Sequence, residues 1–92
     1  MNSYREYAPY FRNGLLYLPE KTVTLLVDVG LDQTTGDAAL RGLALDDHQE
    51  QIARISQALE QALAQMEDDT QAYHALTSGE AQFMLTGKPT NV

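Results

Sequence analysis

Hydrophobic and polar residues alternate in the first half of the chain. Residues 21–31 (KTVTLLVDVGL) place these apolar residues on one face: Val23, Leu25, Val27, Val29 and Leu31. A period of two with β-branched residues predicts a strand with one buried face, although Leu26 breaks the alternation. The apolar run at 15–18 predicts a neighbouring strand, and Pro19 and Glu20 separate the two.

The segment at 38–45 (AALRGLAL) is the natural return strand. It follows residues 32–37 (DQTTGD), whose composition is typical of turns. Its alternation is poorer than that of residues 21–31, so a helix stays open as an alternative here. Strands at 15–18, 21–31 and 38–45 would form an antiparallel β-hairpin or a three-stranded meander.

Beyond residue 46 the apolar spacing changes to three and four, which is typical of one face of a helix. This helical stripe consists of Ile52, Ile55, Leu59, Ala62, Leu63 and Met66. It predicts a long helix over 47–67, which Asp47 and Glu50 would begin as the two ends of a capping box. No glycine or proline interrupts residues 43–78.

Shorter helices are predicted on both sides of these elements. Ser3 and Glu6 fit a capping box that begins a helix over 3–11, and Pro9 limits it to a turn or two. Two further helices are predicted at 69–76 and 78–86, followed by a loose tail at 88–92. Strands followed by helices predict one small α+β domain over 1–92, in which the long helix packs against the sheet.

The charge is unevenly distributed. The net charge is −7, and residues 46–87 carry eight acidic residues against Arg54 alone, whereas residues 1–45 carry five acids against four bases. The basic residues are scattered singly, which argues against direct binding of DNA or RNA. The acidic balance also argues against an anionic membrane surface.

The chain has no cysteine, which excludes disulfides and thiolate metal sites. Its N-terminal segment lacks the basic flank and continuous apolar run of a signal peptide. The longest apolar run is too short to span a bilayer. These features predict a cytoplasmic protein.

Few residues are arranged for chemistry. His48 and His74 are the only histidines, and a metal site would need both to meet carboxylates such as Asp47 or Asp69. No nucleophile elbow or phosphate-binding glycine loop is present. We therefore expect no catalytic residue, no metal and no cofactor. A small metal-dependent or acid–base enzyme that uses the two histidines and carboxylates is the third of three functional hypotheses, and the first two are given below.

Two explanations compete for the acidic half. The helix dipole stabilises carboxylates at a helix N-terminus, which accounts for Asp46, Asp47 and Glu50 without a partner. Residues 67–69 are explained in the same way if they begin the next helix. Alternatively, unneutralised acids beside the glutamines at 57, 61 and 65 form a surface that attracts a basic partner.

The functional reading is a non-enzymatic protein-binding module, a regulator or inhibitor of immunity, antitoxin or decoy type, that acts on a larger basic protein. The expected contact residues are Asp46, Asp47, Glu50, Gln57, Glu60, Gln61, Glu67, Asp68 and Asp69, together with Tyr4 and Tyr7 from the tyrosine-rich N-terminus. The alternative is a homodimer or larger homo-oligomer that pairs through the helical stripe at 52–66 or through a strand edge.

Overall fold

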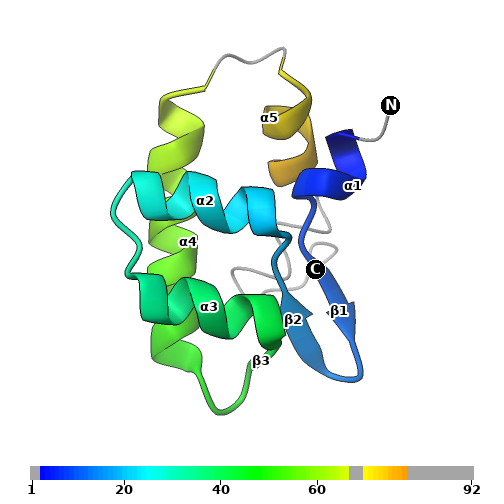
Figure 1. The fold of residues 1–92 in the computed structure, drawn as a ribbon, viewed down its shortest axis with the longest axis vertical. Coiled ribbons are helices and arrows are strands. Elements are labelled where there is room, and N and C mark those ends of the chain that lie inside the picture. The colour runs from blue at the N-terminus through cyan, green and yellow to red at the C-terminus, as the bar shows by residue number, and fades with distance from the viewer. Residues whose placement is uncertain (1–2, 67–69, 79–92) are drawn as a thin grey trace, which may run out of the picture.

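The computed structural model describes residues 3–66 and 70–78 (Figure 1). In chain order its elements are α1 (Ser3–Tyr7), β1 (Tyr10–Arg12), β2 (Leu15–Tyr17), α2 (Glu20–Asp28), α3 (Gln33–Arg41), β3 (Leu43–Ala44), α4 (Gln49–Ala64) and α5 (Gln71–Leu76). The predicted α+β class is confirmed, with a three-stranded antiparallel sheet in the order β1-β2-β3 and the longest helix in the C-terminal half.

The sheet begins with a tight hairpin. Asn13 and Gly14 connect β1 to β2 and both have positive φ angles, the combination that a two-residue hairpin turn of type I′ requires. Tyr10 pairs with Tyr17, and β3 joins the other edge of β2 through Leu15 and Ala44. The strand predicted at 15–18 is therefore confirmed as β2.

The strand predicted over 21–31 is wrong, because this segment forms helix α2. Val23 and Leu26, three residues apart, are 3% and 0% exposed. The hydroxyl of Thr24 donates to the carbonyl of Glu20, a bond that threonines make inside helices. Because residues 23–27 are almost all apolar, they fit a helix with a wide buried face as well as they fit an alternating strand.

The strand predicted over 38–45 is wrong for residues 38–41, where the helical alternative is confirmed. Helix α3 begins at the N-cap Asp32, in the segment predicted as a turn. The Asp32 carboxylate accepts bonds from the backbone N–H and the hydroxyl of Thr35, at 2.9 Å and 2.8 Å. Gly42 ends the helix with a φ angle of 109°, and strand geometry is limited to Leu43 and Ala44.

The long helix predicted at 47–67 is confirmed as α4, Gln49–Ala64, but its predicted N-cap is wrong. The cap position is occupied by His48, because the N–H of Asp47 bonds Ala44 O in a turn before the helix. The His48 Nδ1 atom lies 3.0 Å from the same carbonyl oxygen. A carbonyl only accepts, so this contact requires a proton on Nδ1.

The two ends of the chain are partly described. The N-terminal helix stops at Tyr7 rather than at residue 11, because Pro9 interrupts it and β1 follows. The helix predicted at 69–76 is confirmed as α5, and Thr70 caps it by accepting from the N–H of Tyr73. The helix predicted at 78–86, apart from residue 78, and the tail at 88–92 lie outside the described residues.

The helices enclose one hydrophobic core. Helices α2 and α3 form an antiparallel pair, α2 crosses α4, and α1 packs against α2 and α5 (Figure 1). The largest fully buried hydrophobic side chains are Leu16, Leu26, Leu43, Ile55 and Leu76. They come from β2, α2, β3, α4 and α5, so the sheet and the helices share this core.

Candidate protein-binding surface

Helix α4 exposes the polar residues that lie opposite its apolar stripe. Ile52, Ile55 and Leu59 are buried, so the stripe faces the core. The opposite side of the helix carries Glu50, Gln57, Glu60 and Gln61, and all four are exposed. The structure therefore brings four of the expected contact residues to one solvent-facing side of α4.

Asp46 and Asp47 lie in the turn between β3 and α4, and both are exposed. With Glu50 they place three carboxylates at the N-terminal end of α4, where the helix dipole stabilises negative charge. We call Asp46, Asp47, Glu50 and Glu60 the acidic surface.

The acidic surface is not neutralised by the cations of the described region. In residues 3–66 and 70–78, the ion pair present joins Lys21 Nζ to Glu6 Oε1 at 3.0 Å. The hydrogen bond to Glu6 and the charge of that carboxylate raise the pKa of Lys21. This pair involves α1 and α2 rather than α4, so it leaves the four carboxylates facing water without a described partner.

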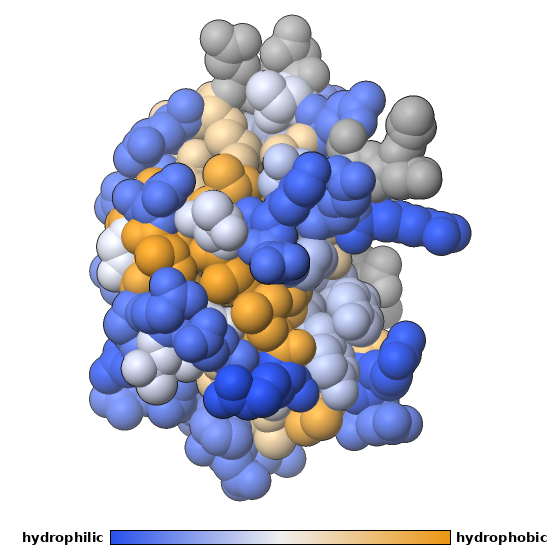
Figure 2. All heavy atoms as spheres, viewed as in Figure 1, coloured by the Kyte–Doolittle hydropathy of each residue, from blue (hydrophilic) through white to orange (hydrophobic). Residues whose placement is uncertain are grey.

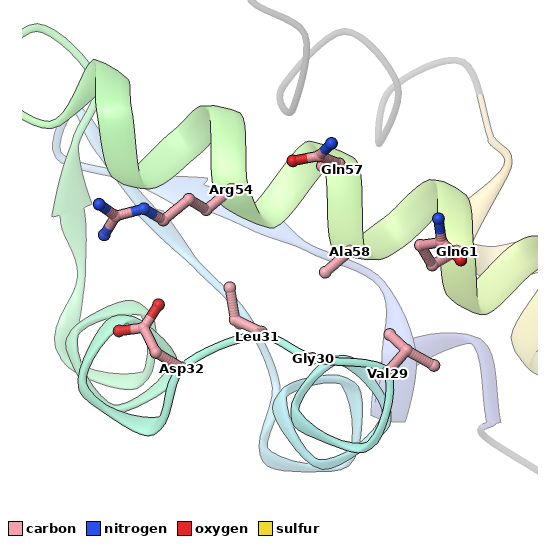
Figure 3. Close-up of a pocket in the computed structure, with 8 residues that line it drawn as sticks. All are labelled: Val29, Gly30, Leu31, Asp32, Arg54, Gln57, Ala58 and Gln61. Carbon is pink, nitrogen blue, oxygen red and sulfur yellow. The ribbon is translucent and has the colours of Figure 1, made fainter.

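An open hollow of about 260 Å³ lies beside α4 (Figure 3). One wall is the connection between α2 and α3, residues 29–32. The other wall is formed by Arg54, Gln57, Ala58 and Gln61 of α4. Two of the expected contact residues, Gln57 and Gln61, thus lie at the rim of this hollow.

Asp32 and Arg54 face one another from opposite walls of the hollow (Figure 3). The hydroxyl and the backbone N–H of Thr35 lower the pKa of Asp32 by hydrogen bonding its charged form, and the positive charge of Arg54 lowers it slightly further. Both bonds from Thr35 end on Oδ2 of Asp32. The backbone N–H of Asp32 itself also lowers the pKa of this carboxyl group, and within residues 3–66 and 70–78 Arg54 makes no ion pair within 4.0 Å.

The other expected contacts are not brought to this surface. Tyr7 is half-buried against the core on α1, with Lys21 Nζ 6.0 Å from its ring centre. Only the backbone of Tyr4 is described, within the same helix. Glu67, Asp68 and Asp69 lie outside the described residues.

Sequence reasoning missed Asp32 and Arg54 as site residues. The sequence pattern places Asp32 in a turn and marks Arg54 only as the single base of the acidic half. The helix N-cap pattern Asp32-Gln33-Thr34-Thr35 was the available signal for the first. Nothing in the sequence indicated that these two residues would share a hollow.

A separate aromatic group lies on the β-hairpin. The rings of Tyr10 and Tyr17 stack with centres 5.2 Å apart, and the guanidinium of Arg12 lies 5.9 Å from the Tyr10 ring centre. Tyr10 and Phe11 are 43% and 37% exposed on β1, which is an edge strand of the described sheet. Figure 2 shows a further group of apolar residues over the α2–α3 pair, where Leu40 is exposed.

Comparison with known proteins assigns no family: no family model, no curated protein and no solved structure matches this chain. Within the described ranges, no three or more His, Asp or Glu side chains group as a metal site would require. None of the helices described here combines the length and apolar character needed to cross a bilayer.

Proposed function

We propose that this chain is a non-enzymatic module whose acidic surface binds a basic region of a larger protein, as a regulator or inhibitor of that protein would. The observation that carries the proposal is the unneutralised set of carboxylates on α4 and the turn before it. Arg54, the one cation on the same helix, lines the hollow, and its guanidinium lies on the side of Asp32 (Figure 3).

Electrostatic attraction gives this surface a specific role in binding. Exposed charges of one sign accelerate the encounter with an oppositely charged partner, and they contribute less to the lifetime of the complex. The glutamines beside them supply hydrogen-bond donors and acceptors without adding charge. The acidic surface would therefore set how fast and in which orientation the partner arrives.

A matched pair of substitutions tests this proposal. Glu50 and Glu20 are both exposed, and each lies in the first turn of a helix. Glu50→Lys and Glu20→Lys therefore change the net charge equally and carry a similar cost from the helix dipole. We expect Glu50→Lys to slow association with a basic partner, first isolated with the wild-type chain, about threefold at low salt. Stopped-flow or surface plasmon resonance measures this rate.

The expected slowing of association depends on the salt concentration and on which of the two glutamates is replaced. The difference between Glu50→Lys and wild type should shrink as salt is raised, because exposed charges are screened beyond about 10 Å at 0.1 M ionic strength. Equal slowing by the two variants, or slowing that salt does not alter, would contradict a binding role for the acidic surface.

Self-association is a second candidate, and the exposure of Tyr10 and Phe11 on an edge strand favours it. Pairing through the helical stripe at 52–66 would need these residues on the surface, but Ile52, Ile55 and Leu59 are buried inside the single chain. Self-association by pairing of two copies along the edge strand β1 stays a prediction.

A further inference from the structure

We propose that the outer edge of β1 binds an extended, acidic segment of another protein, which joins the described sheet as an additional antiparallel strand. The segment would place a glutamate or aspartate opposite Arg12 and an apolar residue opposite Phe11. This edge lies on the other side of the molecule from α4 (Figure 1), so the inference goes beyond the proposed function and does not depend on it.

The backbone of Phe11 provides the hydrogen bonds for an added strand. In an antiparallel hairpin closed by a two-residue turn, the residues beside the turn exchange hydrogen bonds, and every second pair after them does the same. These pairs are Arg12 with Leu15 and Tyr10 with Tyr17. The N–H and C=O of Phe11 therefore point away from β2. In residues 3–66 and 70–78, no backbone hydrogen bond outside the helices and strands involves either group.

The edge available for pairing is short. Pro9, which precedes β1, has no N–H, and Asn13 lies in the turn with a φ angle of 54°. An added segment therefore exchanges one full pair of backbone hydrogen bonds, with Phe11. Its side chains must supply the rest of the affinity and the selectivity, as they do when peptides add to other sheet edges.

The face of the sheet that bears Phe11 selects an apolar residue. Residues directly opposite one another in a sheet share a face, so Phe11 lies on the same face as its partner Leu16. Leu16 is fully buried in the core, whereas Phe11 on the edge strand is 37% exposed. An apolar side chain opposite Phe11 would bury this ring and extend the core by one strand.

Arg12 supplies an uncompensated charge. It is exposed, and it is the single charged residue between positions 7 and 19. The nearest acid along the chain, Glu6, pairs with Lys21, and Arg12 makes no ion pair within 4.0 Å in residues 3–66 and 70–78. The acids at 46–47 follow β3, which β2 separates from β1. An acidic residue of the added strand opposite Arg12 is therefore attracted, and a lysine there is repelled.

Neighbouring aromatic side chains restrain Arg12. Its guanidinium lies 5.9 Å from the ring centre of Tyr10, close enough for a cation–π contact. The Tyr10 ring stacks in turn on Tyr17, with ring centres 5.2 Å apart. An arginine that is restrained before binding loses less conformational entropy when it meets a carboxylate. Tyr10 is 43% exposed, so an aromatic or β-branched residue of the added strand opposite it would pack against its ring.

A short peptide tests this arrangement in the full chain. An antiparallel segment meets Arg12, Phe11 and Tyr10 in that order, so from its N-terminus it reads acid, apolar, aromatic. The probe is acetyl-Thr-Glu-Val-Tyr-Thr-amide. In two-dimensional ¹H–¹⁵N NMR it should shift the amide of Phe11, with a dissociation constant on the order of 1 mM, because one exposed charge pair contributes little. The peptide with lysine in place of glutamate should bind about threefold more weakly.

The hydrogen bonds and the charge are tested separately. N-methylation of the valine removes the N–H that would donate to the carbonyl of Phe11, and it should abolish the shift of the Phe11 amide. Arg12→Gln should remove the preference for the glutamate peptide over the lysine peptide. Arg5→Gln removes the same charge from an exposed position in α1, and it should leave the threefold preference intact.

The inference is wrong if the probe does not shift the Phe11 amide, or if the N-methylated or lysine peptide binds as tightly as the probe. A preference for glutamate that survives Arg12→Gln would overturn it as well. A Phe11 shift that grows with the concentration of the chain alone would mean that a second copy occupies the edge, which also overturns it. None of these results bears on the acidic surface, whose test compares Glu50→Lys with Glu20→Lys.

Discussion

At the scale of single residues, Leu26 shows how the structure resolves an ambiguous pattern. The alternating pattern placed Leu25 inside and Leu26 outside, whereas in helix α2 Leu26 is fully buried and Leu25 is half-buried. The residue that broke the alternation is thus the central core residue of its segment. One exception in a short alternating run was a signal of helix that the sequence already contained.

This pair of leucines provides a direct test of the helix. Leu26→Ala should reduce the free energy of unfolding by about 2–5 kcal/mol, the usual cost of a cavity at a fully buried leucine. Leu25→Ala removes the same atoms from a half-buried position and should cost about 1 kcal/mol. Urea denaturation followed by circular dichroism measures both values. A larger loss at Leu25 would support the strand instead.

At the scale of elements, the α2–α3 pair depends on a close approach at Gly36. Glycine inside a helix costs about 1 kcal/mol relative to alanine. However, a Cβ added at Gly36 would lie 2.8 Å from Cγ1 of Val23, closer than real carbon atoms approach. The absence of a side chain at position 36 therefore allows the two helices to pack in contact, which places the connection at 29–32 beside α4.

Gly36→Ala should therefore destabilise the fold by about 1 kcal/mol, since overpacking costs about 1–3 kcal/mol and the better helix propensity returns about 1 kcal/mol. In a Val23→Ala background the clash is gone, so the same change should be neutral or stabilising. Thermal unfolding of the four proteins in this double-mutant cycle measures the coupling. Destabilisation of equal size in both backgrounds would mean that Val23 is not the obstructing contact.

At the scale of the whole molecule, the acidic surface and the aromatic strand edge belong to different elements. Helix α4 and β1 lie on opposite sides of the ribbon in Figure 1. The net charge of −7 opposes the association of two copies, and the helical stripe that could have joined them is buried. These features favour a single chain that meets a different, basic protein.

We therefore expect the chain to stay monomeric from micromolar to millimolar concentration, measured by light scattering or sedimentation. Phe11→Glu, which adds a charge to the exposed edge strand, serves as the control. A mass that rises with concentration in the wild-type chain, and no longer rises in Phe11→Glu, would favour the second candidate instead.

Part of the surface was predictable for a simple geometric reason. Once the stripe from Ile52 to Met66 indicates which side of the helix is buried, the residues on the opposite side must face solvent. The exposure of Glu50, Gln57, Glu60 and Gln61 was predictable in this way, and their role as contacts stays a prediction. The position of Tyr7 was not, because its half-buried state depends on how α1 packs against α2 and α5.

Local patterns in the sequence thus determined the α+β class, the strand at residues 15–17 and the long helix with its acidic, solvent-facing side. These features depend on neighbours within a few positions along the chain. Tertiary packing decided that residues 20–28 form a helix rather than a strand, because the apolar positions within 23–27 are compatible with both periods and Leu26 was the one local sign of a helix. The same packing formed the hollow, since Asp32 and Arg54 line it together only when the α2–α3 pair lies against α4.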